Sequence, residues 1–209
     1  MITAGPTYEA IDPVRFIGNH SSGKMGFALA ETAANLGAKV ILISGPVSLN
    51  ITNDFVSLIR VTSAQEMYDR AYENFENCDI AILSAAVSDF SPEVIASQKI
   101  KKKADSLRLT LKKTKDILAS LGEIKKDKYL VGFALETENE IENAKTKLKK
   151  KNLDLIVLNS LNDKGAGFKT DTNKVTLISR DNKVYPFEVK PKTEVAKDIL
   201  QHIIKQFHA

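Results

Sequence analysis

Short apolar runs recur along the chain, and amphipathic stretches separate them. The runs are rich in Val, Ile and Leu without polar alternation, as in strands that are buried on both faces. They cover residues 1–4, 39–44, 56–61, 80–84, 129–134 and 155–159. Apolar residues at helical spacing predict helices over 22–36, 63–77, 138–151 and 193–207. This alternation predicts an α/β fold with a Rossmann-like, mostly parallel sheet flanked by helices.

Two further regions depart from this pattern. Residues 107–112 alternate apolar and polar side chains, which predicts a half-exposed antiparallel strand. Residues 175–179 and 184–188 flank a polar turn and predict a hairpin. No repeat or linker divides the chain, so we expect a single domain over 1–209 with an antiparallel flap or hairpin extension. Because its first strand begins at Met1, we expect this domain to be excised from a longer polypeptide.

Composition narrows the possible partners. The chain is 43% apolar and 27% charged, as is ordinary for a globular protein. No segment approaches the ~20 consecutive apolar residues of a membrane helix, so we expect no membrane partner. Cys78 is the only cysteine, which excludes an internal disulfide and favours a cytoplasmic location. The net charge of +4 suits an anionic small molecule. No aromatic residues interleave with the lysines, so we expect no nucleic acid.

A basic, glycine-containing loop precedes the first predicted helix. Residues 18–24 match the start of the phosphate-binding pattern G-x-x-x-x-G-K-S/T, but Met25 stands where the Mg²⁺-binding hydroxyl should be. This excludes a P-loop NTPase. The helix start still favours an anion, unless Ser21 or Ser22 serves only as its N-cap. A nicotinamide site is not expected, because Pro6 interrupts the first turn and G-x-G-x-x-G is absent.

Other candidate residues lie at the ends of predicted strands, where ligands bind in open α/β sheets. Asp89 follows one strand and either holds a ribose hydroxyl or caps a turn. Phe133 either stacks on a base or belongs to the core. Lys147 and Lys151 share a helix face and could hold a polyphosphate, although they and the basic run 99–103 could also be solvated surface. The histidines lack ligand spacing, so we expect no protein-built metal site.

Six ordered motifs together carry a resemblance to a known family. They are NHSSGKMG after IDPVRFI, then AAVSDFSP, KIKK, VGFALETEN, KNLDLIVLN and GFKTDTNKVTLI. The chain resembles phosphopantothenoylcysteine synthetases, above all the CTP-using bacterial kind, over nearly its whole length. In that kind the synthetase is normally the C-terminal half of a protein whose N-terminal half is a decarboxylase. The resemblance therefore implies that FMN belongs to the decarboxylase half and not to this domain.

The resemblance implies a ligase of coenzyme A biosynthesis. In that reaction the carboxylate of 4′-phosphopantothenate attacks the α-phosphate of CTP, pyrophosphate leaves, and an acyl-cytidylate remains. The amine of L-cysteine then displaces CMP and forms an amide. Mg²⁺ is expected to be bound mainly through the nucleotide phosphates. The resemblance also implies a homodimer, formed partly through elements near 166–178, whose active site includes residues from both subunits.

Matching motifs assign roles to individual residues. Asn19 is implied to orient the acyl-cytidylate and to donate from its amide to a developing oxyanion. Lys99 is implied to bind the CTP phosphates and support activation, on a basic flap over the nucleotide. The residues implied to bind CTP are Asp89, Lys99, Lys115, Asp116, Ile117, Leu118, Phe133, Lys147 and Lys151. Those implied to bind phosphopantothenate are Asn19, Ser22, Gly23, Lys24, Ala85 and Ala86. The family usually has Asn-Pro-Asp-Ile where this chain has Thr-Lys-Asp-Ile at 114–117, a loss of proline expected to loosen that turn.

Two other functions remain alternatives at this level. One is a Rossmann-type reductase that uses a nucleotide or dinucleotide. The other is a basic RNA-binding domain, for which the lysine content is the only support.

Overall fold

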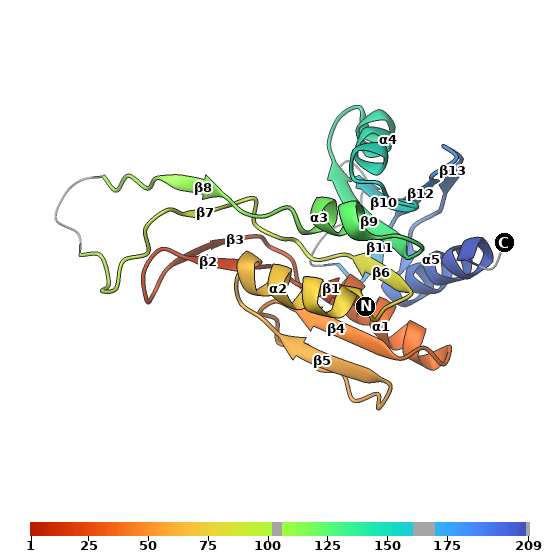
Figure 1. The fold of residues 1–209 in the computed structure, drawn as a ribbon, viewed down its shortest axis with the longest axis horizontal. Helices are drawn as coiled ribbons and strands as arrows, with labels where there is room; N and C mark the ends of the chain where they lie inside the picture. The colour runs from red at the N-terminus through yellow and green to blue at the C-terminus, as the bar shows by residue number, and fades with distance from the viewer. Residues whose placement is uncertain (102–105, 161–169, 208–209) are drawn as a thin grey trace.

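The computed structural model describes residues 1–101, 106–160 and 170–207. Within these residues an eight-stranded sheet forms the centre of the molecule, with the strand order β13-β12-β10-β9-β6-β1-β4-β5 (Figure 1). The parallel strands are β1 (Ile2–Ala4), β4 (Val40–Ser44), β5 (Val56–Arg60), β6 (Ile80–Leu83), β9 (Tyr129–Glu136) and β10 (Leu155–Ser160). Two antiparallel strands, β12 (Val175–Ser179) and β13 (Val184–Pro186), extend one edge. The predicted mixed α/β fold is therefore confirmed.

Helices cover both faces of this sheet. Helices α1 (Lys24–Asn35) and α5 (Lys192–Phe207) pack on one face, against strand residues such as Leu42 and Leu155. Helices α2 (Ala64–Phe75), α3 (Ile117–Ile124) and α4 (Glu140–Lys150) pack on the other, against neighbours such as Ile43 and Ile156. Adjacent strand residues thus alternate between two apolar layers, which is why these strands show no polar alternation. Among the described residues, every helix is too short or too polar to span a bilayer.

The first helix begins later than its sequence pattern predicts. Gly23, and not a serine, is the N-cap of α1, with a φ of 76° that side chains rarely adopt. The hydroxyl of Ser21 accepts a bond from the Gly23 N–H, at 3.3 Å. Helix α2 is capped by Ser63, whose hydroxyl accepts from the Glu66 N–H at 3.2 Å. The Glu66 carboxylate, however, accepts from the N–H of Thr62 at 2.6 Å rather than from that of Ser63.

A long arm projects from one end of the sheet (Figure 1). It consists of the hairpin β2 (Tyr8–Ala10) and β3 (Phe16–Gly18) and of the ribbon β7 (Phe90–Pro92) and β8 (Leu111–Lys113), with the described residues between these strands. The strand predicted at 107–112 pairs only from Leu111 onward. Large apolar side chains along the arm are exposed, namely Val14, Phe16, Phe90, Val94, Ile95, Leu107, Leu109 and Leu111. The arm is the antiparallel extension that the pattern predicts.

A second small sheet lies before α5. Its strands are β11 (Thr172–Asn173) and β14 (Lys190–Pro191), which pair antiparallel. Helix α5 starts directly after β14, at Lys192, which is only 7% exposed. This sheet brings the start of α5 beside the start of α1.

Candidate functional site

Two adjoining cavities lie at the carboxyl ends of the central strands, where an open α/β sheet binds its ligands. The larger has a volume of about 730 Å³ and the smaller of about 140 Å³. Their common wall consists of Ala85, Ala86, Phe133, Ala134 and Leu135. A molecule in one cavity can therefore contact a molecule in the other across small side chains.

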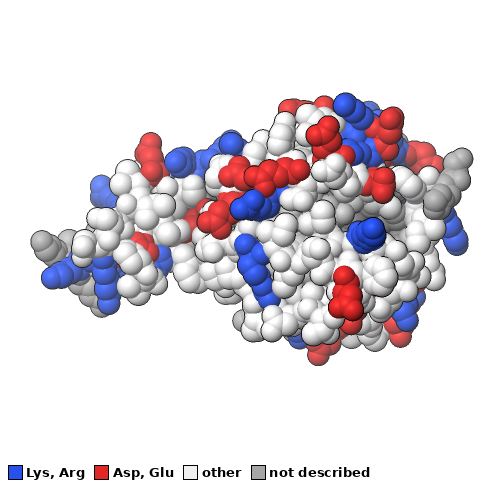
Figure 2. Space-filling view, turned by 60° about the horizontal axis from the view of Figure 1, so that its bottom comes forward, with Lys and Arg blue, Asp and Glu red and all other residues white. Residues whose placement is uncertain are grey.

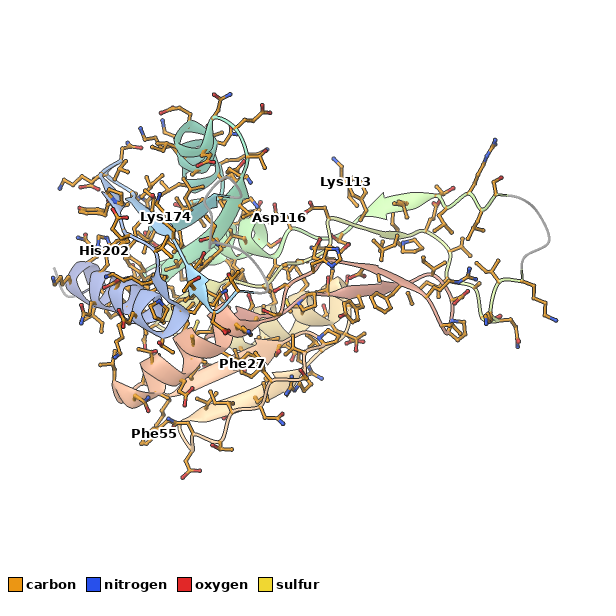
Figure 3. The ribbon with its side chains drawn as sticks, turned by 180° about the vertical axis from the view of Figure 1, so that it is seen from behind. Phe27, Phe55, Lys113, Asp116, Lys174 and His202 are labelled. Atoms are coloured by element: carbon orange, nitrogen blue, oxygen red, sulfur yellow. The ribbon has the colours of Figure 1, made fainter. Side chains whose placement is uncertain are left out.

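The larger cavity gathers most of the residues assigned to CTP. Its lining includes Asn19, Asp89, Lys115, Asp116, Ile117, Leu118, Phe133, Lys147 and Lys151. These residues come from the ends of β6 and β9, the root of the arm, the start of α3 and the final turn of α4. Figure 3 shows Lys113 and Asp116 where the arm joins the body of the molecule. Segments far apart in the sequence thus meet in one hollow.

The turn at 114–117 is anchored by hydrogen bonds, although it lacks the expected proline. The Thr114 hydroxyl donates to the Ser88 carbonyl at 2.7 Å, and the Thr114 N–H donates to the Asp89 carbonyl at 3.0 Å. Asp116 is the N-cap of α3 and accepts from the Ala119 N–H at 3.0 Å. These bonds anchor the turn to the segment that follows β6 and to the start of α3.

Three of the four described lysines that line the larger cavity, all except Lys113, have a partner on the protein. Lys147 contacts Glu136 at 2.6 Å, and Lys151 contacts Asp116 at 2.9 Å. Burial raises the pKa of Asp116, but the Ala119 N–H and Lys151 outweigh it and hold that pKa below its ordinary value. The Lys115 ammonium lies 4.4 Å from the centroid of the Tyr68 ring, within cation–π range. These contacts place three ammonium groups around one opening.

The side-chain amide of Asn19 points its nitrogen at two backbone carbonyls. Its amide nitrogen donates to the carbonyls of Ala86, at 3.0 Å, and of Val87, at 3.2 Å. Because both partners are acceptors, the nitrogen and not the oxygen must face them. Donation to a developing oxyanion would use the same two hydrogens, so it would require these bonds to be exchanged, and the role implied for Asn19 stays a prediction. The Oδ1 atom is the one that can meet a ligand, as an acceptor.

The smaller cavity lies at the start of α1 and contains the residues assigned to phosphopantothenate. Ser22, Gly23 and Lys24 line it, and Ala85 and Ala86 belong to its shared wall. The free N–H groups at a helix start favour an anion. The Lys24 ammonium contacts the Asp171 carboxylate at 2.5 Å, so a positive and a negative side chain lie side by side at this point.

Sequence reasoning missed four polar residues of this cavity: Ser84, Asn159, Asn173 and Lys192. The Lys192 ammonium donates to the carbonyls of Thr170 and Thr172. Burial and the nearby Lys24 lower the pKa of Lys192. Asn159 lies at the end of a predicted strand, where ligands bind in open α/β sheets, so its position could have indicated a binding residue. Nothing local in the sequence distinguishes Lys192 from other lysines.

Lys99 is the one assigned residue that lines neither cavity. It is exposed on the arm, beyond β7. Its neighbours Lys102 and Lys103 lie outside the described residues, as do His208 and positions 166–169 of the expected dimer contact. Within the described part of the chain no three His, Cys, Asp or Glu side chains form a group that could hold a metal ion. Mg²⁺ carried by the nucleotide phosphates stays a prediction.

Comparisons with known proteins show which family the chain belongs to. The family model for the DNA/pantothenate metabolism flavoprotein C-terminal domain matches residues 1–207. The coenzyme A biosynthesis bifunctional protein CoaBC of Bacillus subtilis is 50% identical over 203 residues, which are 97% of this chain and 50% of that protein. A protein of an unknown prokaryotic organism, named cysteine/cysteine sulfinic acid decarboxylase, is 53% identical over 208 residues, 99% of this chain and 58% of its own. The chain spans about half the length of the curated relatives it matches.

Solved structures give the same result. The crystal structure of the C-terminal domain of CoaBC has a TM-score of 0.84 and 42% identity, covering 99% of this chain and 94% of that one. The DNA/pantothenate metabolism flavoprotein of Streptococcus pneumoniae has a TM-score of 0.84 and 26% identity, covering 98% and 97%. The resemblance read from the motifs is thereby confirmed. The chain belongs to the DNA/pantothenate metabolism flavoprotein C-terminal domain family and is homologous to the C-terminal phosphopantothenoylcysteine synthetase domain of CoaBC.

Proposed function

We propose that this chain is a CTP-dependent phosphopantothenate–cysteine ligase of coenzyme A biosynthesis. The supporting observation is that the residues assigned to two different substrates line two adjoining cavities with a common wall. The relatives named for coenzyme A biosynthesis support the same reaction. The wall of Ala85 and Ala86 is the place where an acid in one cavity can meet a phosphate in the other.

The larger cavity is the proposed nucleotide site. The backbone of 115–118, fixed by Asp116 and Thr114, faces the base, and Lys147 and Lys151 face the phosphates. Their carboxylate partners keep the ammonium groups in place, and each pair has one side chain open to solvent, Lys147 at 45% and Asp116 at 51% exposed, so a ligand can reach both pairs. A polyphosphate can therefore replace Glu136 and Asp116 as partner. Mg²⁺ bound to the phosphates would add further neutralising charge.

The smaller cavity is the proposed site of phosphopantothenate. Its phosphate end is placed near the start of α1, Lys24 and Lys192, and its carboxylate lies along the shared wall. The carboxylate oxygen forms a bond to the α-phosphorus of CTP while the bond to the bridging oxygen breaks. Pyrophosphate leaves with that electron pair. The protein contributes positioning and charge, which dominate catalysis of phosphoryl-centred reactions.

Asn19 acts in the proposed second step. The Oδ1 atom, left for a ligand by the bonds to Ala86 and Val87, accepts a hydrogen bond from the amine of cysteine. That bond aims the nitrogen lone pair at the acyl carbon. The amine forms the amide bond, loses a proton, and CMP leaves with the electrons of the broken C–O bond. Orientation of this kind accounts for a large share of many rate enhancements.

Lys99 is proposed to supply a further cation to the CTP phosphates. Its place on the arm, away from both cavities of its own chain, favours action on a second copy. The exposed apolar side chains of the arm give such a copy a surface to contact. We therefore propose a homodimer with residues of both subunits at each site. A decarboxylase domain with FMN in the full-length protein and a cytoplasmic location complete the proposal.

The reaction itself is the test. The chain is incubated with CTP, 4′-phosphopantothenate and cysteine, and each substrate is omitted in turn. Sustained pyrophosphate release must require all three, and a single turnover without cysteine must leave a trapped acyl-cytidylate. Pyrophosphate release that ignores phosphopantothenate contradicts the proposal. A change in NAD(P)H absorbance would favour the reductase instead.

RNA binding that weakens with rising salt and that CTP does not inhibit would support the RNA-binding alternative. The surface gives it little support. Figure 2 shows basic side chains near the end of the arm, but basic and acidic side chains are mixed over the rest of that face.

A further inference from the structure

A buried carboxylate in the arm fastens the segment that carries Lys99. Asp12, in the turn between β2 and β3, is only 2% exposed. Its Oδ2 atom accepts from the backbone N–H of Ile100 at 3.1 Å. The guanidinium of Arg15 donates to the carbonyl of the same Ile100 at 2.9 Å. Both backbone polar groups of the residue that follows Lys99 are therefore bound by one turn.

The two clamping side chains also hold each other. Arg15 donates through Nε to Asp12 Oδ2 at 3.0 Å, and the terminal nitrogen of its guanidinium lies 2.5 Å from the same oxygen. Asp12 Oδ1 accepts from the N–H groups of Val14, at 2.8 Å, and of Arg15, at 2.9 Å. A further bond, from the Ala96 N–H to the Ile11 carbonyl at 3.0 Å, ties the preceding residues to the same turn. Asp12 thus joins the turn and the Lys99 segment in one network.

The segment depends on this network because none of the strand pairs among the described residues includes it. The ribbon of β7 and β8 pairs only Phe90–Pro92 with Leu111–Lys113, and Ile100 lies beyond it. An exposed lysine on an unanchored backbone samples many positions, and binding a phosphate must then restrict all of them. A backbone that is already held loses less freedom on binding, which strengthens the contact.

We propose that Asp12 is a positioning residue that, together with Arg15, fixes the backbone at Ile100 so that Lys99 is held ready for the nucleotide phosphates. The inference rests on the proposed function, because it assigns a purpose to Lys99. It adds a residue to which none of the sequence motifs gave a role. Asp12 contacts no substrate in this scheme and acts only through the segment it binds.

Asparagine is the sharpest substitution at this position. Each contact of Asp12 described above comes from a donor, so an amide of the same size must turn its own NH₂ group toward at least one N–H. Asp12→Asn therefore breaks the clamp without removing volume. Asp12→Ser is the second variant, since a short hydroxyl can still cap the turn but cannot reach Ile100. Asp181→Asn is the matched control, a turn carboxylate far from both cavities that also accepts a side-chain bond.

The first experiment is a double-mutant cycle on the activation step, measured as single-turnover pyrophosphate release from CTP and phosphopantothenate. Loss of a hydrogen bond to a charged group predicts that Asp12→Asn slows this step by about tenfold. Because Asp12 acts through Lys99, the variant with both Asp12→Asn and Lys99→Gln must be no slower than Lys99→Gln alone. Asp181→Asn must keep the wild-type rate. Losses that multiply in the double variant overturn the proposal.

The second experiment measures the segment without reference to activity. A nitroxide label is attached at Lys101→Cys, while Cys78 is buried and reacts little. Both Asp12 variants must increase the mobility of the label, and Asp181→Asn must not. Unchanged mobility in folded Asp12→Ser protein overturns the clamp. A wild-type rate in Lys99→Gln, with mobility still controlled by Asp12, overturns instead the role of Lys99 in the proposed function and so the catalytic purpose of the clamp.

Discussion

Gly26 offers the most direct test of how the smaller cavity is built. It lies in the first turn of α1, where that helix packs on the carboxyl end of β1. A methyl group at Gly26 would lie 2.5 Å from the β-carbon of Ala4, 2.8 Å from the hydroxyl of Ser84 and 3.0 Å from the α-carbon of Ala4. Carbon atoms in contact sit about 3.5–4.0 Å apart, so α1 must move by about 1 Å to accommodate Gly26→Ala.

Two opposing effects determine how much Gly26→Ala changes the free energy of unfolding. Replacing glycine by alanine in a helix stabilises it by about 1 kcal/mol. Overpacking a close contact costs about 1–3 kcal/mol. The α- and β-carbons of Ala4 cannot rotate away, and the approach to 2.5 Å puts the cost in the upper part of this range, about 2–3 kcal/mol. We therefore expect a net loss of about 1–2 kcal/mol, which lowers the Tm of a domain of this size by about 2–8 °C. Moving the helix start by 1 Å relative to Ala85 and Ala86 predicts a loss of up to about 100-fold in kcat/KM for phosphopantothenate.

Thermal unfolding and steady-state kinetics measure both quantities. The control is Glu31→Ala, which raises helix propensity on the exposed side of the same helix and should leave kcat/KM unchanged. A Gly26→Ala protein that melts at or above the wild-type temperature, with unaltered kinetics, would refute the reasoning. A lower Tm with normal kinetics would refute only the functional part.

Three further predictions concern single side chains. Asn19→Ala should consume CTP once and accumulate the acyl-cytidylate, seen by quenched-flow chromatography; normal multiple turnover would contradict its role. Lys99→Gln should fail before that point, so wild-type pyrophosphate release would reject its assignment. Burial, with a smaller effect of Lys205, lowers the pKa of His202, whose Nε2 atom is buried without a hydrogen-bond partner among the described residues. As the pH falls, His202 therefore takes up a proton in the unfolded chain before it does so in the folded protein. The free energy of unfolding should fall as the pH drops below about 6.5, and this fall should be absent in His202→Phe. Urea titrations at several pH values measure both.

The central sheet and most of the cavity lining could be read from the sequence for one physical reason. Strands buried on both faces are continuous apolar runs, and parallel strands end at the same edge of their sheet. Residues that follow such runs, such as Ala85, Asp89 and Phe133, therefore had to meet. Lys147 and Lys151 reach the cavity through their long side chains, which contact Glu136 at the end of β9 and Asp116 at the start of α3.

Other features depend on contacts that the local sequence does not encode. Helix α3 is short and contains Gly122, which lowers its helical signal, yet a β-carbon there would lie 2.0 Å from the Lys151 carbonyl. Two segments of the arm are joined by the hydrogen bond between Asp12 and Ile100, which are 88 positions apart. The position of Lys99 was unpredictable for that reason. The hydrogen-bond direction of Asn19 was set by two carbonyls on another segment.

The common wall of the two cavities has a consequence for how specificity can change over evolution or in engineering. Because Ala85 and Ala86 border both hollows, a bulkier residue there would exclude both substrates together, and selection has little freedom at these positions. The start of α3 borders only the larger hollow. Under the proposed function, replacements at Lys115 or Leu118 are therefore expected to change the choice of base while the acid that is activated stays the same.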